Sequence, residues 1–378
     1  MPDVEPVPLA QLTTLRAGGA PARMIDAHTA DELAATMREV WRNGDDWLVV
    51  GGGSNLFVGD EPFDGTVVRV RTEGIERRAS PRPGYSRLRV QAGHDWDALV
   101  AYAVDAGLAG IEAMSGIPGT VGGAPVQNIG AYGQEIVQTL VEVELIDEDS
   151  GEVTNVPAAE LGLGFRTSVL KHHYGSAPAR RAVILSVTFE LAEVGDAEYP
   201  VRGEQLRTAL GLAPGASVSL RWVRDHVLDT RRRKGMVLDD ADPDTWSAGS
   251  FFQNAVVSET FARTLPAECP RWALAPDLDP VVVIPLAAWD GAVPAYTADA
   301  AQVKVSAAWL IENSGIRKGF HLPRSRAGLS TKHALALSNR GQATAAEIAE
   351  LARFIQGRVQ SEFGLILQPE PVLVGVEI

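Results

Sequence analysis

Hydrophobic and polar positions along the chain repeat with two periods, one typical of helices and one typical of strands. Thr29 and Glu32 have capping-box spacing, and the apolar residues after them recur at helical intervals, so we predict a helix from about residue 30 to 43. Thr344 and Glu347 have the same spacing in front of a longer helix with an apolar face. Weaker helical periods occur at residues 94–110, 203–210, 218–228 and 305–315.

Short apolar runs bounded by glycine or polar residues lie between these helices and are typical of strands. They occur at residues 46–50, 65–70, 86–93, 140–147, 152–157, 181–191, 281–289 and 371–378. The sequence DSGE at residues 149–152 predicts a hairpin turn and therefore an antiparallel pair. Helices and strands are therefore expected to be interspersed along the chain.

Composition narrows the possible partners. The 378 residues are 46% hydrophobic and 22% charged, which is ordinary for a globular protein of about two or three domains. The net charge of −14 disfavours nonspecific binding to nucleic acid or to an anionic membrane. Residues 1–12 lack the features of a targeting peptide, and no apolar run reaches the roughly 18 residues of a membrane span. We expect a soluble, cytoplasmic protein.

Several kinds of chemistry are excluded or disfavoured by residue type. The single cysteine, Cys269, excludes an internal disulfide and a multi-cysteine metal site. His172 and His173 are adjacent and have no acidic or cysteine partner at ligand spacing, so we expect no metal site. No serine occurs in a Gly-x-Ser-x-Gly elbow, which removes the α/β-hydrolase mechanism.

Two glycine-rich stretches are candidate ligand loops. The first, Gly51 to Asn55, follows a predicted strand, and successive backbone N–H groups in such a turn form an anion-binding nest. It matches neither a dinucleotide fingerprint nor a P-loop. The second, Ile117 to Gly133, contains five glycines interleaved with hydrogen-bonding side chains, with Gly116 just before it, and suits a large ligand that carries phosphates and rings. Tight turns between strands are the alternative for both.

Four further features have two interpretations each. Arg166 lies among apolar residues and is either a surface side chain or a buried ligand for an anion. The basic run 231–234 is typical of a solvated face but is also suited to phosphates. Ser250, between Gly249 and two phenylalanines, is either a hydroxyl in a dry pocket or part of a plain turn. Glu370, between two prolines, is a fixed carboxylate or an incidental surface charge.

Taken together, the motifs GGGSN, IPGTVGGAPVQNIGAYG, FRTS, AGSFFQN and QPEP resemble, in order and spacing, those of the UDP-N-acetylenolpyruvoylglucosamine reductase (UDP-N-acetylmuramate dehydrogenase) family. The resemblance extends from about Thr14 to the last residue, and the double phenylalanine and the long segment 201–250 are similar to the type I branch. It implies an α+β fold with a two-subdomain flavin-binding module similar to the vanillyl-alcohol oxidase (PCMH-type) fold, followed by an α+β substrate-binding domain.

The resemblance also implies the domain limits and the ligands. Residues 1–72 would form the first FAD-binding subdomain, completed by the strand at 367–378; residues 73–230 would form the second, and residues 231–366 the substrate-binding domain. FAD would bind noncovalently, because the first glycine loop has no histidine for covalent attachment. NADPH would reduce it, and UDP-N-acetylglucosamine enolpyruvate would be reduced to UDP-N-acetylmuramate for peptidoglycan synthesis, by a protein expected to be monomeric.

Site residues are carried over from the family motifs. Catalytic roles fall on Arg166, which would neutralise the substrate carboxylate, on Ser250, which would protonate C2, and on Glu370, a hydrogen-bonded partner or acid. The cofactor-binding positions are Gly51, Gly52, Gly53, Ser54, Asn55, Ile117, Pro118, Gly119, Gly122, Gly123, Gln127, Asn128, Gly130 and Ala131. The substrate-binding positions are Tyr132, Arg231, Lys234, Asn254 and His333.

The chain departs from the family pattern at a loop that folds over the nucleotide. Type I relatives carry a tyrosine there, whereas this chain has Gly203, with Tyr199 as the nearest substitute. Two other functions stay open from the residues alone. One is a different flavin oxidoreductase on the same scaffold, similar to a sugar or lactone oxidase, and the other is a UDP-sugar-binding protein without catalytic activity.

Overall fold

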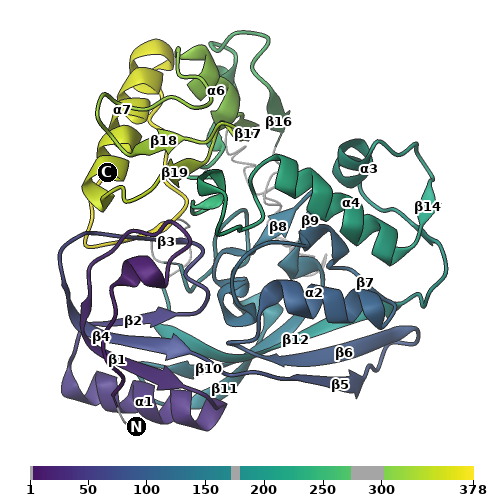
Figure 1. Cartoon of the computed structure of the whole chain (residues 1–378). Helices are drawn as coiled ribbons and strands as arrows, with labels where there is room; N and C mark the ends of the chain where they lie inside the picture. Colours follow the sequence, from purple (N-terminus) through teal and green to yellow (C-terminus); the bar gives the residue numbers. More distant parts are fainter. Residues whose placement is uncertain (1–2, 172–178, 274–301) are drawn as a thin grey trace, which may run out of the picture.

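The computed structural model describes residues 3–171, 179–273 and 302–378, and Figure 1 shows the whole chain. The strand predicted at 281–289 and the pair His172 and His173 lie outside the described residues. Helices and strands are interspersed throughout the described chain, which confirms the α+β class. Within the described part, no helix is both long and apolar enough to cross a membrane.

A small parallel sheet forms the first unit. Its order is β1-β4-β2, with β1 at Pro21–Ala27, β2 at Trp47–Val50 and β4 at Phe63–Val70. Helix α1 (Ala30–Asn43) begins at the predicted capping box of Thr29 and Glu32 and ends at Gly44, which has a left-handed backbone. Its buried face, which includes Leu33, Met37 and Val40, contacts both β1 and the larger sheet. The helix therefore joins the two sheets.

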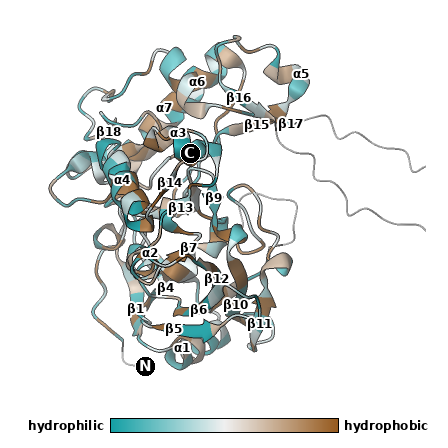
Figure 2. Cartoon of the chain, turned by 90° about the vertical axis from the view of Figure 1, so that its right-hand side faces the viewer, coloured by the Kyte–Doolittle hydropathy of each residue, from teal (hydrophilic) through white to brown (hydrophobic). Residues whose placement is uncertain are grey.

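The larger sheet is antiparallel, with strand order β11-β10-β12-β6-β5 and with β7 paired to β12. Its strands are β5 (Ile75–Ala79), β6 (Tyr85–Gln91), β7 (Leu108–Ala109), β10 (Leu140–Asp147), β11 (Val153–Pro157) and β12 (Ala182–Glu193). Residues 183–189 of β12 are all buried, as expected for a central strand covered on both faces. In Figure 2, β12 is brown, whereas the charged edge strand β5 is teal. The exposed charges disfavour pairing of this edge with another chain.

Helices cover one side of this sheet. Asp95 caps the N-terminus of helix α2 (Trp96–Asp105). Trp96 packs edge to face against Phe189 of β12, with ring centroids 5.9 Å apart. Helix α4 (Leu220–Arg233) lies beside α2 (Figure 1) and begins at Ser219. Helix α3 (Glu204–Leu210) and the pair β13 (Tyr199–Pro200) and β14 (Ser217–Val218) complete a small separate core with α4.

The C-terminal unit combines a three-stranded antiparallel sheet, a hairpin and three helices, at the top of Figure 1. The elements are β15 (Ala255–Ser258), α5 (Glu259–Ala262), β16 (Arg271–Ala273), β17 (Gln302–Val305), α6 (Ala307–Asn313), β18 (Ala327–Leu329), β19 (Leu337–Asn339) and α7 (Ala345–Phe363). Residues Leu15 and Phe57 of the N-terminal unit belong to the core of this unit. The two units are therefore packed together through apolar side chains.

The end of the described chain returns to the first unit. Strand β20 (Val372–Val374) pairs in parallel with β3 (Leu56–Val58), the strand that follows the first glycine loop. Helix α4 continues to Arg233, across the expected limit at residue 230, and Gly235 after it adopts a left-handed backbone. The division of the chain into subdomains stays a prediction.

Helix α7 is tied to the N-terminal unit at its first turn. The Asp60 carboxylate accepts hydrogen bonds from the backbone N–H groups of Ala345 (2.7 Å) and Ala346 (2.9 Å), while Thr344 caps the N–H of Glu347. A helix begins with N–H groups that lack partners inside the helix, and Asp60 satisfies two of them from another unit.

We predict that Asp60→Ala lowers the free energy of unfolding by about 1–2 kcal/mol, the usual effect of losing a helix cap. Urea unfolding followed by circular dichroism measures the change. Glu61→Ala, which removes the neighbouring exposed carboxylate, is the matched control. Equal losses in the two variants would contradict the capping role.

Candidate active site

A cavity of about 1040 Å³ lies where the three units meet. Its lining includes the first glycine loop, the stretch from Ile117 to Tyr132, the end of α4 and the segment around Ser250. Apolar side chains, among them Trp47, Val49 and Leu170, cover part of the wall. The volume is at the upper end of the range for ligand pockets, so the cavity can hold a dinucleotide.

The two glycine loops form one wall and touch each other. A Cβ on Gly52 would stand 2.6 Å from the Cα of Gly119, so both loops need glycine to approach this closely. Gly53 has a φ of +59°, which glycine adopts without strain. Among the described residues, no backbone N–H group of residues 52–55 donates to a protein acceptor. Such unpaired donors are suited to an anion such as a diphosphate.

Arg166 occupies the tip of a tight turn in which the Thr167 N–H donates to the Gly164 carbonyl. Its φ of +56° is unusual for a residue with a side chain. The guanidinium donates to two backbone carbonyls of the second glycine stretch, those of Asn128 (3.1 Å) and Gly130 (2.8 Å). These bonds hold the charged group in the cavity wall, so the structure supports the buried alternative for Arg166.

Glu370 faces Arg166 across the cavity wall. One of its carboxylate oxygens lies 3.2 Å from the Arg166 Nε, and the side chain is 14% exposed. Burial raises the pKa of Glu370, although the charges of Arg166 and Lys171 act in the opposite direction. The incidental surface charge considered for Glu370 is therefore excluded, because the carboxylate is buried and paired.

Backbone hydrogen bonds hold the segment of Glu370 beside the segment that follows Ser250. The Glu370 N–H donates to the carbonyl of Phe251 (2.8 Å), and the Gln253 N–H donates to the carbonyl of Gln368 (3.0 Å). Phe251 is fully buried, and its ring packs edge to face against Phe57, with centroids 5.6 Å apart. The phenylalanine therefore anchors the segment in the core while Ser250 remains on the cavity.

Cationic side chains line another part of the cavity. Arg231 and Lys234 come from the end of α4, and Lys234 lies over the ring of Tyr132, with its Nζ 5.6 Å from the centroid. The buried Arg231 Nε has no hydrogen-bond partner among the described residues. An Arg224–Asp97 pair with two hydrogen bonds, of 2.6 and 2.7 Å, joins α4 to α2. The cations are therefore presented from a fixed helix.

His333 completes this cationic region. Burial and the charges of Lys234, Lys318 and Arg231 lower the pKa of His333 to about 4. The imidazole is therefore neutral near pH 7. Its Nδ1 accepts from the Leu335 N–H at 3.1 Å, which leaves Nε2 as the ring nitrogen that carries the proton. A neutral donor beside two cations suits the oxygen atoms of an anionic ligand.

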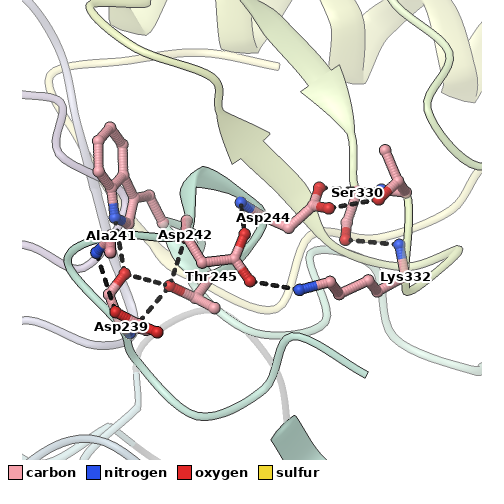
Figure 3. A network of polar contacts seen from close by, with 9 residues as sticks. Asp239, Ala241, Asp242, Asp244, Thr245, Ser330 and Lys332 are labelled. Carbon is pink, nitrogen blue, oxygen red and sulfur yellow. Dashed lines mark hydrogen bonds and ion pairs between the residues drawn. The ribbon is translucent and has the colours of Figure 1, made fainter. Parts of the chain in front are cut away.

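A set of side chains that we term the carboxylate clasp, Asp242, Asp244, Thr331 and Lys332, holds the turn that carries His333 (Figure 3). The Asp244 carboxylate accepts from the Thr331 N–H (2.9 Å) and from its hydroxyl, and Asp242 pairs with Lys332. Thr245 fixes the acidic loop internally by donating to the Asp242 carbonyl at 2.8 Å. The clasp thus connects the loop after α4 to the His333 turn.

The structure brings nearly all of the predicted site residues to this one cavity, and two are corrected. Asn128 does not line it, because its buried side chain bonds to Glu135, Gly164 and Val137. Asn254 does not line it either, because its side-chain oxygen accepts a hydrogen bond of 3.0 Å from the Ala307 N–H at the start of α6. Both asparagines stabilise loops that frame the site.

Other residues near the cavity were missed from the sequence. Trp47, Arg180 and Arg181 line its far end, and Lys171 lies behind Glu370. The position of Lys171, five residues after Arg166 in an apolar segment, was the only available signal. Tyr199 and Gly203 are not among the lining residues of the cavity.

Comparisons with known proteins identify both halves of the chain. A model of the FAD binding domain matches residues 21–156, and a model of the UDP-N-acetylenolpyruvoylglucosamine reductase C-terminal domain matches residues 242–374. A reductase of that name from Leifsonia xyli is 53% identical, covering 99% of this chain and all of the relative. Another, from Saccharopolyspora erythraea, is 48% identical over 97% of this chain and 94% of the relative.

A solved structure gives the same result for the fold. The crystal structure of a UDP-N-acetylenolpyruvylglucosamine reductase from Thermus caldophilus is 25% identical, with 98% of each chain covered and a TM-score of 0.60. The family models and this likeness confirm the predicted combination of a flavin-binding module and a C-terminal domain.

For the carboxylate clasp, we predict that Asp244→Ala speeds amide hydrogen exchange in residues 330–336 by roughly 5–30-fold, because the Thr331 N–H and hydroxyl lose their shared acceptor. Exchange in α7 should not change. Asp240→Ala, which removes a highly exposed carboxylate from the same loop, is the control. Unchanged exchange in residues 330–336 of the Asp244 variant would show that the clasp does not hold the turn.

Proposed function

The chain belongs to the UDP-N-acetylenolpyruvoylglucosamine reductase family, and we propose that it catalyses the FAD-dependent, NADPH-driven reduction of UDP-N-acetylglucosamine enolpyruvate to UDP-N-acetylmuramate. The observation that carries this proposal is the partly buried ion pair of Arg166 and Glu370 on the same cavity as Ser250 and the two glycine loops. Such a reaction needs three parts: a cation that binds the substrate carboxylate, a proton donor, and a site for a dinucleotide.

The cavity wall fits noncovalent FAD. The unpaired N–H groups of residues 52–55 would hold the pyrophosphate, and the apolar side chains of Trp47, Val49 and Leu170 would contact rings. When bound, FAD supplies the redox chemistry, by accepting a hydride from NADPH and passing one to C3 of the enolpyruvyl group. The residues of the chain then have to manage the charge and the proton that accompany the second transfer.

Arg166 is suited to the negative charge that develops on the substrate. Addition of hydride at C3 places charge on C2 and on the carboxylate conjugated to it. A guanidinium already fixed by two backbone carbonyls needs no reorganisation when that charge appears. The Glu370 carboxylate keeps the guanidinium oriented in the absence of substrate. Arg166 therefore binds the carboxylate and stabilises the enolate.

Ser250 is the group we assign to protonation of C2. A serine hydroxyl is a weak acid, so it requires neighbours that stabilise the alkoxide or replace its proton. The segment of Glu370 is hydrogen-bonded to the segment that follows Ser250, and burial raises the pKa of Glu370, so its carboxylate takes up a proton more readily than an exposed one. In this mechanism Ser250 gives the proton to C2, and Glu370 belongs to the network that supports it.

The cationic region is suited to the anionic nucleotide part of the substrate. Arg231 and Lys234 provide charge, and the neutral imidazole of His333 provides a further donor. Tyr132 lies at the junction of this region with the second glycine stretch. We further propose that the protein acts as a monomer in the cytoplasm, in the synthesis of peptidoglycan precursors needed for cell shape and division.

Two half-reactions, recorded by flavin absorbance under anaerobic conditions, test the proposal. The purified protein should be yellow, NADPH should bleach it, and UDP-N-acetylglucosamine enolpyruvate should restore the colour with formation of UDP-N-acetylmuramate. A UDP-sugar-binding protein without catalysis predicts a colourless sample. An oxidase on this scaffold predicts recovery with oxygen but not with the enolpyruvyl substrate.

For Ser250→Ala, we predict a near-normal rate of reduction by NADPH and a reoxidation by the enolpyruvyl substrate that is about 100-fold slower or more, the usual contribution of a positioned proton donor. Stopped-flow absorbance separates the two rates. Ser247→Ala, which changes a buried serine near the site that does not line the cavity, is the control. Equal slowing of both half-reactions by the Ser250 change would contradict the assignment.

A further inference from the structure

Lys171 is a buried cation beside the catalytic pair. Lys171 follows the turn that carries Arg166 in the sequence, and the residue is 4% exposed. The ammonium donates to the side-chain oxygen of Gln127 at 2.8 Å and to the backbone carbonyl of Glu370 at 3.0 Å. Lys171 does not line the cavity, although both of these partners do. Lys171 therefore reaches the cavity through its bonds to Gln127 and Glu370 and through its charge.

These bonds connect four segments that are far apart in the sequence. The Gln127 oxygen also accepts from the Asn55 side chain at 2.7 Å, so the two glycine loops meet at this point. The Val372 N–H donates to the Asn55 carbonyl at 2.9 Å, which ties the first loop to the strand that follows Glu370. Lys171 is the charged member of this junction and bonds to two of its parts.

Lys171 also changes the net charge of the site. Arg166 and an ionised Glu370 neutralise each other, so this pair alone offers little net attraction to an arriving carboxylate. The Lys171 ammonium adds one positive charge in a region shielded from water, where charges act more strongly. Within the described residues, the ionised groups that act on Lys171 are Glu370 and Arg166. With a substrate carboxylate bound, the cluster has equal numbers of positive and negative charges.

We propose that Lys171 is a positioning residue for the second half-reaction, which holds Glu370 and Gln127 in place and leaves the Arg166 site with net positive charge. The inference rests on the proposed function. It names a residue whose removal should impair the oxidation of reduced enzyme by the enolpyruvyl substrate while reduction by NADPH proceeds. A lysine with a structural role alone would affect both half-reactions through the amount of folded enzyme.

Three substitutions separate the effect of the positive charge from that of the hydrogen bonds. Lys171→Met removes both the charge and the hydrogen-bond donor, Lys171→Gln keeps a donor without the charge, and Lys171→Arg keeps the charge. With each variant loaded with FAD, we expect reduction by NADPH to stay within about 2-fold of wild type. Reoxidation by the enolpyruvyl substrate should slow roughly 10–100-fold in the Met variant and less in the Arg variant, in line with a loss of transition-state positioning. Equal slowing of both half-reactions would overturn the proposal.

A pH profile provides a readout that folding alone would not alter. Burial lowers the pKa of Lys171 to about 8, so the ammonium loses its proton in the folded protein as the pH rises through 8. At low substrate concentration, the wild-type reoxidation rate should fall above about pH 8, whereas the Arg variant should stay active because a guanidinium remains charged. The same alkaline decline in both proteins would count against Lys171.

Coupling to Glu370 provides the last test. If Lys171 acts through Glu370, Lys171→Met should slow reoxidation much less in a Glu370→Gln background than in the wild type. Fully additive effects in the double variant would show that Lys171 acts elsewhere. Wild-type enzyme serves as the reference in every run. Failure of the wild type to be reoxidised by the substrate would contradict the proposed function itself, whereas normal wild-type behaviour with unaffected variants would contradict only the role of Lys171.

Discussion

The backbone pairing between residues 251–253 and 368–370 is the constraint on which the site depends. It places Glu370 beside the segment of Ser250, and the ion pair of Glu370 with Arg166 then connects both to the second glycine stretch. Because β20 pairs with β3, the same short segment is also fixed to the first glycine loop. Three units of the chain thus converge on a few backbone hydrogen bonds, protected from water by the buried Phe251.

Electrostatics divides the cavity into regions with different tasks. The first loop offers unpaired N–H groups, the end of α4 offers full positive charges, and the Arg166–Glu370 pair is close to neutral until a carboxylate arrives. An overall charge of −14 makes these local features more important, since the rest of the surface does not attract anions. Discrimination between phosphate and carboxylate therefore depends on position within the cavity.

Sequence patterns predicted the long elements well because capping boxes and apolar periods are local signals. The helix after Thr29 was predicted almost to the residue, and the start of the helix after Thr344 was predicted from its capping box. The short strands β18 and β19 carry no period and were not predicted. The basic run after residue 230 was interpreted as a solvated face or a phosphate site, without the expectation that it ends α4. Asn128 and Asn254 were assigned to ligands and Lys171 was not assigned at all, because the partners of these side chains lie on segments brought near only by folding.

Arg166 provides the most direct test of the central claim, that this convergence builds a site for charge on the substrate. Rapid-mixing absorbance of the Arg166→Ala enzyme measures flavin reduction by NADPH and reoxidation by UDP-N-acetylglucosamine enolpyruvate separately. The account predicts a near-normal first rate and a second rate slower by about 100-fold or more, since one fixed donor to developing negative charge typically contributes that much. A slower first rate with a normal second rate would contradict it.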